Sequence, residues 1–416
     1  MSNILALVIT LICFRVVLDL SYVDFVQPMF YYMGFNYELN IYRYILSWFV
    51  YFISFFFLNK FINKVSDYFI VTCIIFLMAP TTSMFGLDYS LSPTPVLLCV
   101  MSISIIRILL VRKVKFFPNF GVVPNGYIIS IVVSFLLIMI VAANLYRSGV
   151  NLNFNPEDVY KFRDSNAELA DVGFFAYLNN WVYQIISMFL LVAFLSKKSI
   201  IGIFAVLVLQ FFFFAASAHK AVLFMPFMVF GLWFVLEKSN KTYYITSLYL
   251  GFVLFLYLYY LVVDDILLPS IFIRRAFFIP SQLNFFYYEF FSVNEFVFWS
   301  QSVLSNFIEY PFDTDISSLI GPWAFGDDTR ANNGLISSGY ANAGVFGVII
   351  YSVVLGLVLR LIDDLSIGRF PIWFPVSLTA IPLNVAMIQA DLLTSILTHG
   401  LIVSIFLLFL ARKKKF

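Results

Sequence analysis

Long apolar segments alternate with short polar connectors along almost the whole chain. Most of the apolar segments have about the 20 residues that a helix needs to cross a bilayer. The pattern predicts twelve membrane-spanning helices, near residues 3–21, 41–59, 67–84, 94–111, 127–145, 174–196, 199–218, 221–236, 243–263, 343–361, 371–390 and 392–411. The chain is 62% hydrophobic and 12% charged, whereas soluble domains carry about 25% charged residues. We therefore expect an all-α integral membrane protein that forms a single domain over residues 1–416.

The basic residues predict which helix ends face the cytoplasm, because cytoplasmic connectors are enriched in Lys and Arg. A cytoplasmic N-terminus puts 15 of the 25 basic residues in cytoplasmic connectors, while Arg15 and Arg107 fall within spans. The C-terminus is then cytoplasmic as well. Eight basic residues are left on the external side, where positive charge is depleted.

Two external connectors are longer than turns, and they cover residues 146–173 and 264–342. In the first, an Asn-Pro pair precedes two acidic residues, which is typical of a helix start. We expect a short helix there that carries Tyr160 and Arg163 on one face.

The second connector is rich in Phe, Tyr and Trp, and this composition argues against disorder. We expect it to form short helices on the membrane face. Prolines are expected to separate these helices, at Pro269, Pro280 and Pro311.

Six of the eight external cations could line one cavity: Arg147, Arg163, Lys220, Arg274, Arg275 and Arg330. Arginine binds phosphate oxygens in a bidentate manner, and a lipid-linked substrate presents phosphate at the membrane surface. The functional interpretation is a pyrophosphate-binding site. Alternatively, these cations pair with external acids or bind the head groups of membrane lipids.

Uncharged polar and acidic residues of the two long connectors add further candidates. Glu289 lies in an aromatic run, where burial would raise its pKa toward that of a general base, although pairing with Arg274 or Arg275 is the alternative. Amides and hydroxyls beside aromatic rings suit sugar binding, and the candidates are Tyr160, Tyr287, Tyr288, Asn332, Asn333 and Tyr340. The interleaved glycines also fit simple close packing of helices.

Other classes of site have little support in the sequence. The three cysteines and two histidines show no metal-ligand spacing, so no metal is expected. The net charge of +2 and the dispersed basic residues do not indicate a nucleic-acid partner.

Several short motifs resemble the Wzy-type O-antigen polymerases of bacteria, which join oligosaccharide repeat units. The resemblance rests on Arg274-Arg275 with Pro280 and Tyr287-Tyr288, on Ile320-Gly321, on Asn332-Asn333-Gly334, and on the run from Gly339 to Gly347 that leads into a span. The turn Ser217–Lys220 and the pair Tyr160 and Arg163 fit the same pattern.

This resemblance implies a C-class glycosyltransferase on the periplasmic side of the bacterial inner membrane. Its donor would be a growing glycan on undecaprenyl pyrophosphate, its acceptor a single lipid-linked repeat unit, and it would need no cofactor. Arg274, Arg275 and Glu289 would be catalytic, and a chain-length regulator protein is a possible partner. A lipid-linked oligosaccharide flippase or other transporter, and an O-antigen ligase, stay open as alternatives.

Overall fold

The computed structural model describes residues 3–112, 117, 120–155, 159–326 and 328–413, without the side chains of residues 159 and 160. The described chain is helical, and ten of its helices are long and apolar enough to cross a membrane. The protein is an all-α, multi-pass membrane protein.

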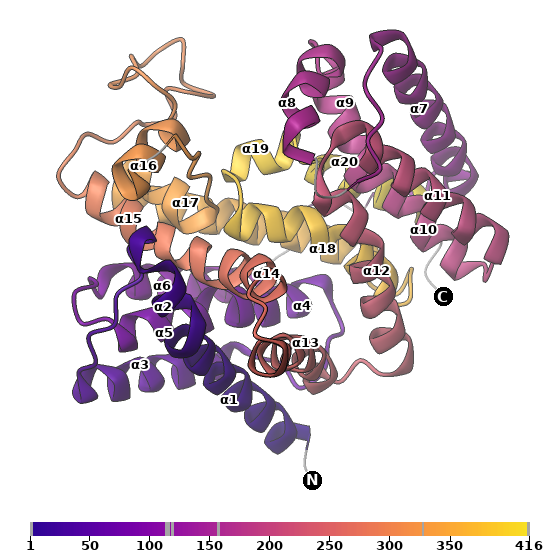
Figure 1. The fold of residues 1–416 in the computed structure, drawn as a ribbon. Coiled ribbons are helices and arrows are strands. Elements are labelled where there is room, and N and C mark those ends of the chain that lie inside the picture. The colour runs from indigo at the N-terminus through magenta and orange to yellow at the C-terminus, as the bar shows by residue number, and fades with distance from the viewer. Residues whose placement is uncertain (1–2, 113–116, 118–119, 156–158, 327, 414–416) are drawn as a thin grey trace.

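The helices follow one another in the order shown in Figure 1. They are α1 (Asn3–Ser21), η1 (Tyr22–Val26), α2 (Gln27–Phe30), η2 (Tyr31–Met33), α3 (Ile41–Ser54), η3 (Phe55–Phe57), α4 (Val65–Thr72), η4 (Cys73–Met78), α5 (Ala79–Leu87), α6 (Thr94–Val111), α7 (Gly126–Ser148), α8 (Val159–Ala170), α9 (Phe175–Trp181), η5 (Val182–Ile186), α10 (Ser187–Ser196), α11 (Ile200–Ser217), α12 (Lys220–Lys238), α13 (Thr242–Val263), α14 (Leu267–Pro269), η6 (Ser270–Phe278), α15 (Ile279–Phe291), α16 (Ile316–Phe325), α17 (Leu335–Ser366), α18 (Trp373–Ile388), α19 (Leu392–Leu397) and α20 (Leu401–Ala411). Of the elements labelled η, η2 and η3 are 3₁₀-helices and the others are π-helices.

The predicted apolar segments all form helices, with differences at five of them. The first helical segment continues to Met33, and the segments Ile41–Phe57 and Trp373–Ile388 are shorter than a full span. The predicted span 392–411 is divided into α19 and α20, because the chain turns at Gly400, which has a φ of 74°. The tenth predicted span begins earlier than expected, at Leu335.

A helical run from Leu267 to Phe291 occupies the first third of the long connector 264–342. The expected breaks at Pro269 and Pro280 are therefore wrong. The wide π-helical turns of η6 lie between these prolines and leave room for a ring that would clash in a regular helix. Most of α15 is buried, and it packs against α17, so this part of the connector belongs to the core.

The helix α17 is broken near its start. Ala343 and Gly344 leave helical geometry, and Gly344 has a φ of 58°, which glycine adopts without strain. The eight residues before the break, 335–342, are all buried. A broken helix inside a membrane protein exposes backbone polar groups and is tolerated where it is buried in protein or lines a cavity.

Connectors that the charge pattern assigns to the cytoplasm lie together at one end of the molecule. The backbone N–H of Ile62 donates to the carbonyl of Asn240 at 2.7 Å, and Arg369 donates to the carbonyl of Lys413 at 2.9 Å. The other end carries α8, α16 and α19, and it is the end that the charge pattern predicts to be external (Figure 1).

Candidate functional site

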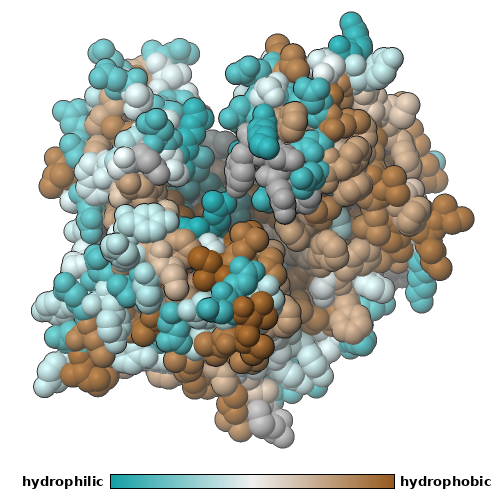
Figure 2. All heavy atoms as spheres, viewed as in Figure 1, coloured by the Kyte–Doolittle hydropathy of each residue, from teal (hydrophilic) through white to brown (hydrophobic). Residues whose placement is uncertain are grey.

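A polar pocket of about 190 Å³ lies at the end of the molecule that carries α16 and α19. Figure 2 shows this end hollowed between the side that contains α15 and α16 and the side that contains α8 and α9. The pocket is lined by Tyr287, Val297, Trp299, Gln301, Ser302, Asp315, Ile316, Ser317, Asn332, Asn333, Ser338, Asn342, Asp391 and Thr394. Amides, hydroxyls, an indole and two carboxylates thus surround one small space. Such groups can bind a sugar through its hydroxyls and its apolar face.

The indole of Trp299 is held in the pocket by a strained loop. Phe298 and Trp299 have φ values of 46° and 57°, in a region that bulky residues rarely adopt. Asn342 fixes both residues, because its carbonyl accepts from the Phe298 N–H at 2.9 Å and its Oδ1 accepts from the Trp299 N–H at 2.7 Å. Backbone strain that is held in place by such hydrogen bonds is typical of functional sites.

Asp391 belongs to a hydrogen-bond network that joins three segments of the chain. Its Oδ2 accepts from the hydroxyl of Tyr351, and that hydroxyl accepts from Trp299 Nε1 at 3.0 Å and from Asn342 Nδ2 at 3.3 Å. Its Oδ1 caps α19 by accepting from the N–H groups of Leu393 and Thr394. The network therefore holds a half-buried carboxylate, an indole and an amide at fixed positions around the pocket.

The second carboxylate, Asp315, caps α16. Its oxygens accept from the N–H and hydroxyl groups of Ser317 and Ser318. Burial opposes ionisation, but these hydrogen bonds and the charge of Arg330 lower the pKa of Asp315 below its usual value. Asp315 is thus a strong acceptor for substrate hydroxyls and a weak base.

Asn333 and Tyr287, two predicted sugar ligands, also hold the pocket together. Asn333 is buried, and its Nδ2 donates to the Pro280 carbonyl at 3.0 Å and to Ser337 Oγ at 2.6 Å. Tyr287 is buried too, and its hydroxyl donates to the carbonyl of Ala331 at 2.7 Å. These hydrogen bonds hold the segment that precedes α17 against α15.

The other predicted sugar ligands have different environments. Asn332 is exposed and lines the pocket, so its amide is available to a ligand. Tyr288 and Tyr340 pack their rings together, with centroids 5.3 Å apart, outside the pocket lining. The side chain of Tyr160 lies outside the described residues.

Arg274 is buried in a setting that is unusual for a cation. It is 7% exposed, its Nε donates to Ser270 Oγ at 2.9 Å, and its guanidinium lies 4.1 Å from the ring centre of Phe30. Its Nη1 contacts the sulfur of Met33, and no acidic residue forms a salt bridge with it within the described chain. Burial and the charge of Arg275 lower the pKa of Arg274 from its ordinary value. A buried guanidinium of this kind lacks the anion that usually compensates it.

The three predicted catalytic residues, Arg274, Arg275 and Glu289, do not line the polar pocket. Arg275 is exposed. Burial and the charge of Asp88 raise the pKa of Glu289, as expected for its aromatic surroundings. Of the two alternative partners considered for Glu289, Arg274 forms no salt bridge with it.

The remaining predicted cations lie on both sides of the hollow. Arg163 is exposed on α8, and burial, with a smaller contribution from the charge of Arg163, lowers the pKa of His219, the residue before Lys220. Arg147 is exposed at the end of α7. Arg330 lies on the α16 side, close enough to affect Asp315. None of the six cations lines the polar pocket.

Most of the pocket lining was not predicted from the sequence, including the three residues best suited to chemistry: Trp299, Asp315 and Asp391. Asp315 carried a signal, because Asp-Ile-Ser-Ser is typical of a helix N-cap. Asp391 separates two long apolar segments and was readable as a simple connector. Trp299 had no signal, since its position depends on Asn342, which is 43 residues away in sequence.

No group of three or more His, Cys, Asp or Glu residues within the described ranges is placed to hold a metal ion. Comparisons of the chain with protein-family models, with curated proteins and with solved structures find no match.

Proposed function

We propose that this protein is a glycosyltransferase that polymerises undecaprenyl-pyrophosphate-linked oligosaccharide repeat units into O-antigen or a similar surface polysaccharide. The observation that carries the proposal is the polar pocket, in which two carboxylates, an indole and several amides surround a space of about 190 Å³. The resemblance of the motifs around Arg274, Asn332 and Gly339 to Wzy-type polymerases supports the same activity.

In the proposed reaction, a hydroxyl at the non-reducing end of the acceptor attacks the anomeric carbon of the donor's reducing-end sugar. The bond from that carbon to the pyrophosphate oxygen breaks, and undecaprenyl pyrophosphate leaves with the electron pair. Asp391 takes the proton of the hydroxyl, Trp299 stacks on the sugar, and Asp315 and Asn332 orient its hydroxyls. Holding two membrane-anchored substrates in line contributes much of the rate.

Cations stabilise the charge that develops on the leaving pyrophosphate. Arg330 is the nearest candidate, because it influences the pKa of the pocket residue Asp315. Arg274, a buried cation with no acidic partner among the described residues, is a second candidate for the pyrophosphate. The pocket would face the periplasm from the inner membrane of a bacterium, and a chain-length regulator would be a partner.

A transporter of lipid-linked oligosaccharides is the second candidate, and the break in α17 favours it. Transporters often bind substrate where helices are interrupted, and Ala343 and Gly344 interrupt α17 next to the pocket residue Asn342. Against it, the polar pocket lies at one end of the molecule, close to the connectors, where two lipid-linked substrates can meet. An O-antigen ligase would share the pocket and is distinguished by its product.

Cells that lack the gene, complemented with pocket variants, test the proposal. With Trp299→Ala or Asp391→Asn, a polymerase loses long glycan chains while single repeat units still reach the cell surface. A lost transporter instead leaves repeat units on the cytoplasmic leaflet, and a lost ligase leaves long chains on the lipid carrier. Either of these last outcomes would contradict the proposed activity.

A further inference from the structure

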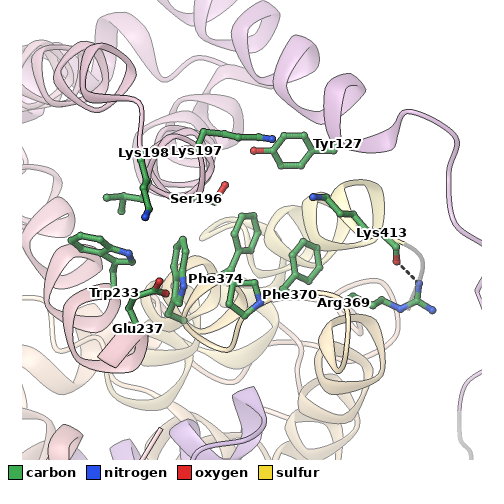
Figure 3. Close-up of a pocket in the computed structure, with 13 residues that line it drawn as sticks. Tyr127, Ser196, Lys197, Lys198, Trp233, Glu237, Arg369, Phe370, Phe374 and Lys413 are labelled. Atoms are coloured by element: carbon green, nitrogen blue, oxygen red, sulfur yellow. Dashed lines mark hydrogen bonds between the residues drawn. The ribbon is translucent and has the colours of Figure 1, made fainter. Parts of the chain in front are cut away.

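A second and larger cavity, of about 310 Å³, lies at the opposite end of the molecule from the polar pocket. Helices α7, α10, α12, α18 and the end of α20 surround it. Figure 3 shows the basic residues Lys197, Lys198, Arg369 and Lys413 around this space, with Glu237 opposite. Its volume is at the lower end of the range for small-molecule sites.

The floor of the cavity is aromatic. Phe370 and Phe374 stack with ring centres 4.7 Å apart, and the side chains of Trp233 and Trp373 also line the cavity. Lys197 places its ammonium 5.7 Å from the ring centre of Tyr127. A site with aromatic walls and cationic rims suits an amphipathic ligand with an anionic group.

Two buried donors of this cavity lack acceptors. Trp373 is 3% exposed, and its Nε1 has no hydrogen-bond partner among the described residues. The Nε of Arg369 is also buried without a partner, although its Nη1 donates to the carbonyl of Lys413 at 2.9 Å. Buried donors are normally satisfied, so two of them at one cavity indicate a missing acceptor.

The positive charge here is not compensated by the described protein. Four cations and one acid line the cavity, and none of the five forms a salt bridge within the described residues. The charge of Arg369 contributes, after burial, to lowering the pKa of Arg412 next to Lys413. An anionic acceptor would satisfy both the donors and the charge.

We propose that this cavity binds a phosphate ester of net negative charge, and that its natural occupant is the head group of an anionic phospholipid. The location at the helix ends, the aromatic floor and the basic rim all fit a lipid head group at the membrane surface. Because the charge pattern assigns this end to the cytoplasm, the lipid would come from the cytoplasmic leaflet. The inference does not depend on glycosyl transfer, which concerns the other end of the molecule.

Binding to the purified full-length protein in neutral detergent tests this proposal. Short-chain phosphatidylglycerol, short-chain phosphatidylcholine and glycerol phosphate are titrated separately, and bound ligand is counted by native mass spectrometry. We expect phosphatidylglycerol to bind more tightly than phosphatidylcholine. Equal binding of glycerol phosphate and phosphatidylglycerol would support the phosphate site but assign it to a soluble ligand.

Matched variants locate the binding. Lys198→Gln and Arg369→Gln each remove one charge from the cavity, and each is expected to weaken phosphatidylglycerol binding about fivefold. Lys238→Gln is the control, because this exposed lysine lies at the same end but does not line the cavity. Equal binding of the zwitterionic lipid, or the same affinity in all three variants and the wild type, would overturn the proposal.

Discussion

Replacing Arg274 by methionine is expected to abolish activity at little cost in stability. The change keeps most of the apolar volume and removes the charge. What is lost is a hydrogen bond to Ser270, worth about 1 kcal/mol, and a cation–π contact with Phe30, worth about 0.5–2 kcal/mol. What is gained is relief from burying a cation that has no acidic partner among the described residues, a penalty of several kcal/mol. The free energy of unfolding is therefore expected to fall by no more than about 1 kcal/mol, or to rise.

Arg15 provides a matched control for this substitution. It is fully buried, but it pairs with Asp19 at 2.7 Å and also donates to Thr82 at 2.7 Å and to Ser47 at 3.1 Å. Arg15→Met leaves Asp19 buried and uncompensated, so we expect a loss of about 3–5 kcal/mol. We thus expect Arg274→Met to change the free energy of unfolding little or to raise it, and Arg15→Met to lower it strongly.

Unfolding by SDS in mixed micelles, followed by tryptophan fluorescence, measures both variants, and glycan ladders from complemented cells measure activity. The expected result for Arg274→Met is near-normal stability with loss of long glycans. A loss of 3 kcal/mol or more together with normal ladders would refute the reasoning, because Arg274 would then be a structural residue whose charge the protein compensates.

Three further predictions concern the neighbours Asn332 and Asn333, the break in α17, and Glu289. Asn332→Ala is expected to leave the free energy of unfolding unchanged but to reduce glycan length, because Asn332 lines the pocket. Asn333→Leu is expected to lower the free energy of unfolding by about 1–3 kcal/mol, since it removes the donor to the Pro280 carbonyl and to Ser337. Equal stability of the two variants would contradict the structural role of Asn333. Gly347→Ala would place a methyl group 1.9 Å from the carbonyl oxygen of Gly339. We therefore expect the free energy of unfolding in the SDS assay to fall by about 1–3 kcal/mol. An unchanged free energy of unfolding would mean that the two halves of α17 are not so close. The raised pKa of Glu289 means that the folded state holds its proton more tightly than the unfolded state does. The contribution of Glu289 to stability is therefore present below its unfolded-state pKa of 4.5 and lost as the pH rises through the folded-state pKa. Glu289→Gln is expected to raise the thermal midpoint at pH 7 but not at pH 4, and the same difference at both pH values would show that the pKa of this carboxyl is not raised.

The membrane architecture could be predicted from the sequence because hydrophobic length is a local signal. Each apolar segment of the chain forms a helix, and the short helix α8, carrying Arg163, lies where the Asn-Pro signal indicated it. The sequence could not reveal that Leu267–Phe291 is a buried helix, because charged and polar residues such as Arg274, Gln282 and Asn284 lower its mean hydropathy. These residues are accommodated by partners elsewhere in the chain, for example the Met33 carbonyl that accepts from Gln282 at 2.8 Å.

The candidate site was predictable only in part, for the same reason. Asn332 and Asn333 were found because amides cluster there in sequence, and both line the pocket. None of the predicted external cations lines the polar pocket, since sequence gives the side of the membrane but not the position around the bundle. The network of Asp391, Tyr351 and Trp299 joins residues up to 92 positions apart and leaves no local pattern.

Glycan polymerisation can be tested by incubating the purified protein with one defined lipid-linked repeat unit. We expect a ladder of products that differ by one repeat unit, with release of undecaprenyl pyrophosphate, and we expect the Asp391→Asn protein to form no ladder. Unchanged substrate with the wild-type protein, under conditions where it remains folded, would contradict the assignment of the polar pocket to glycan polymerisation.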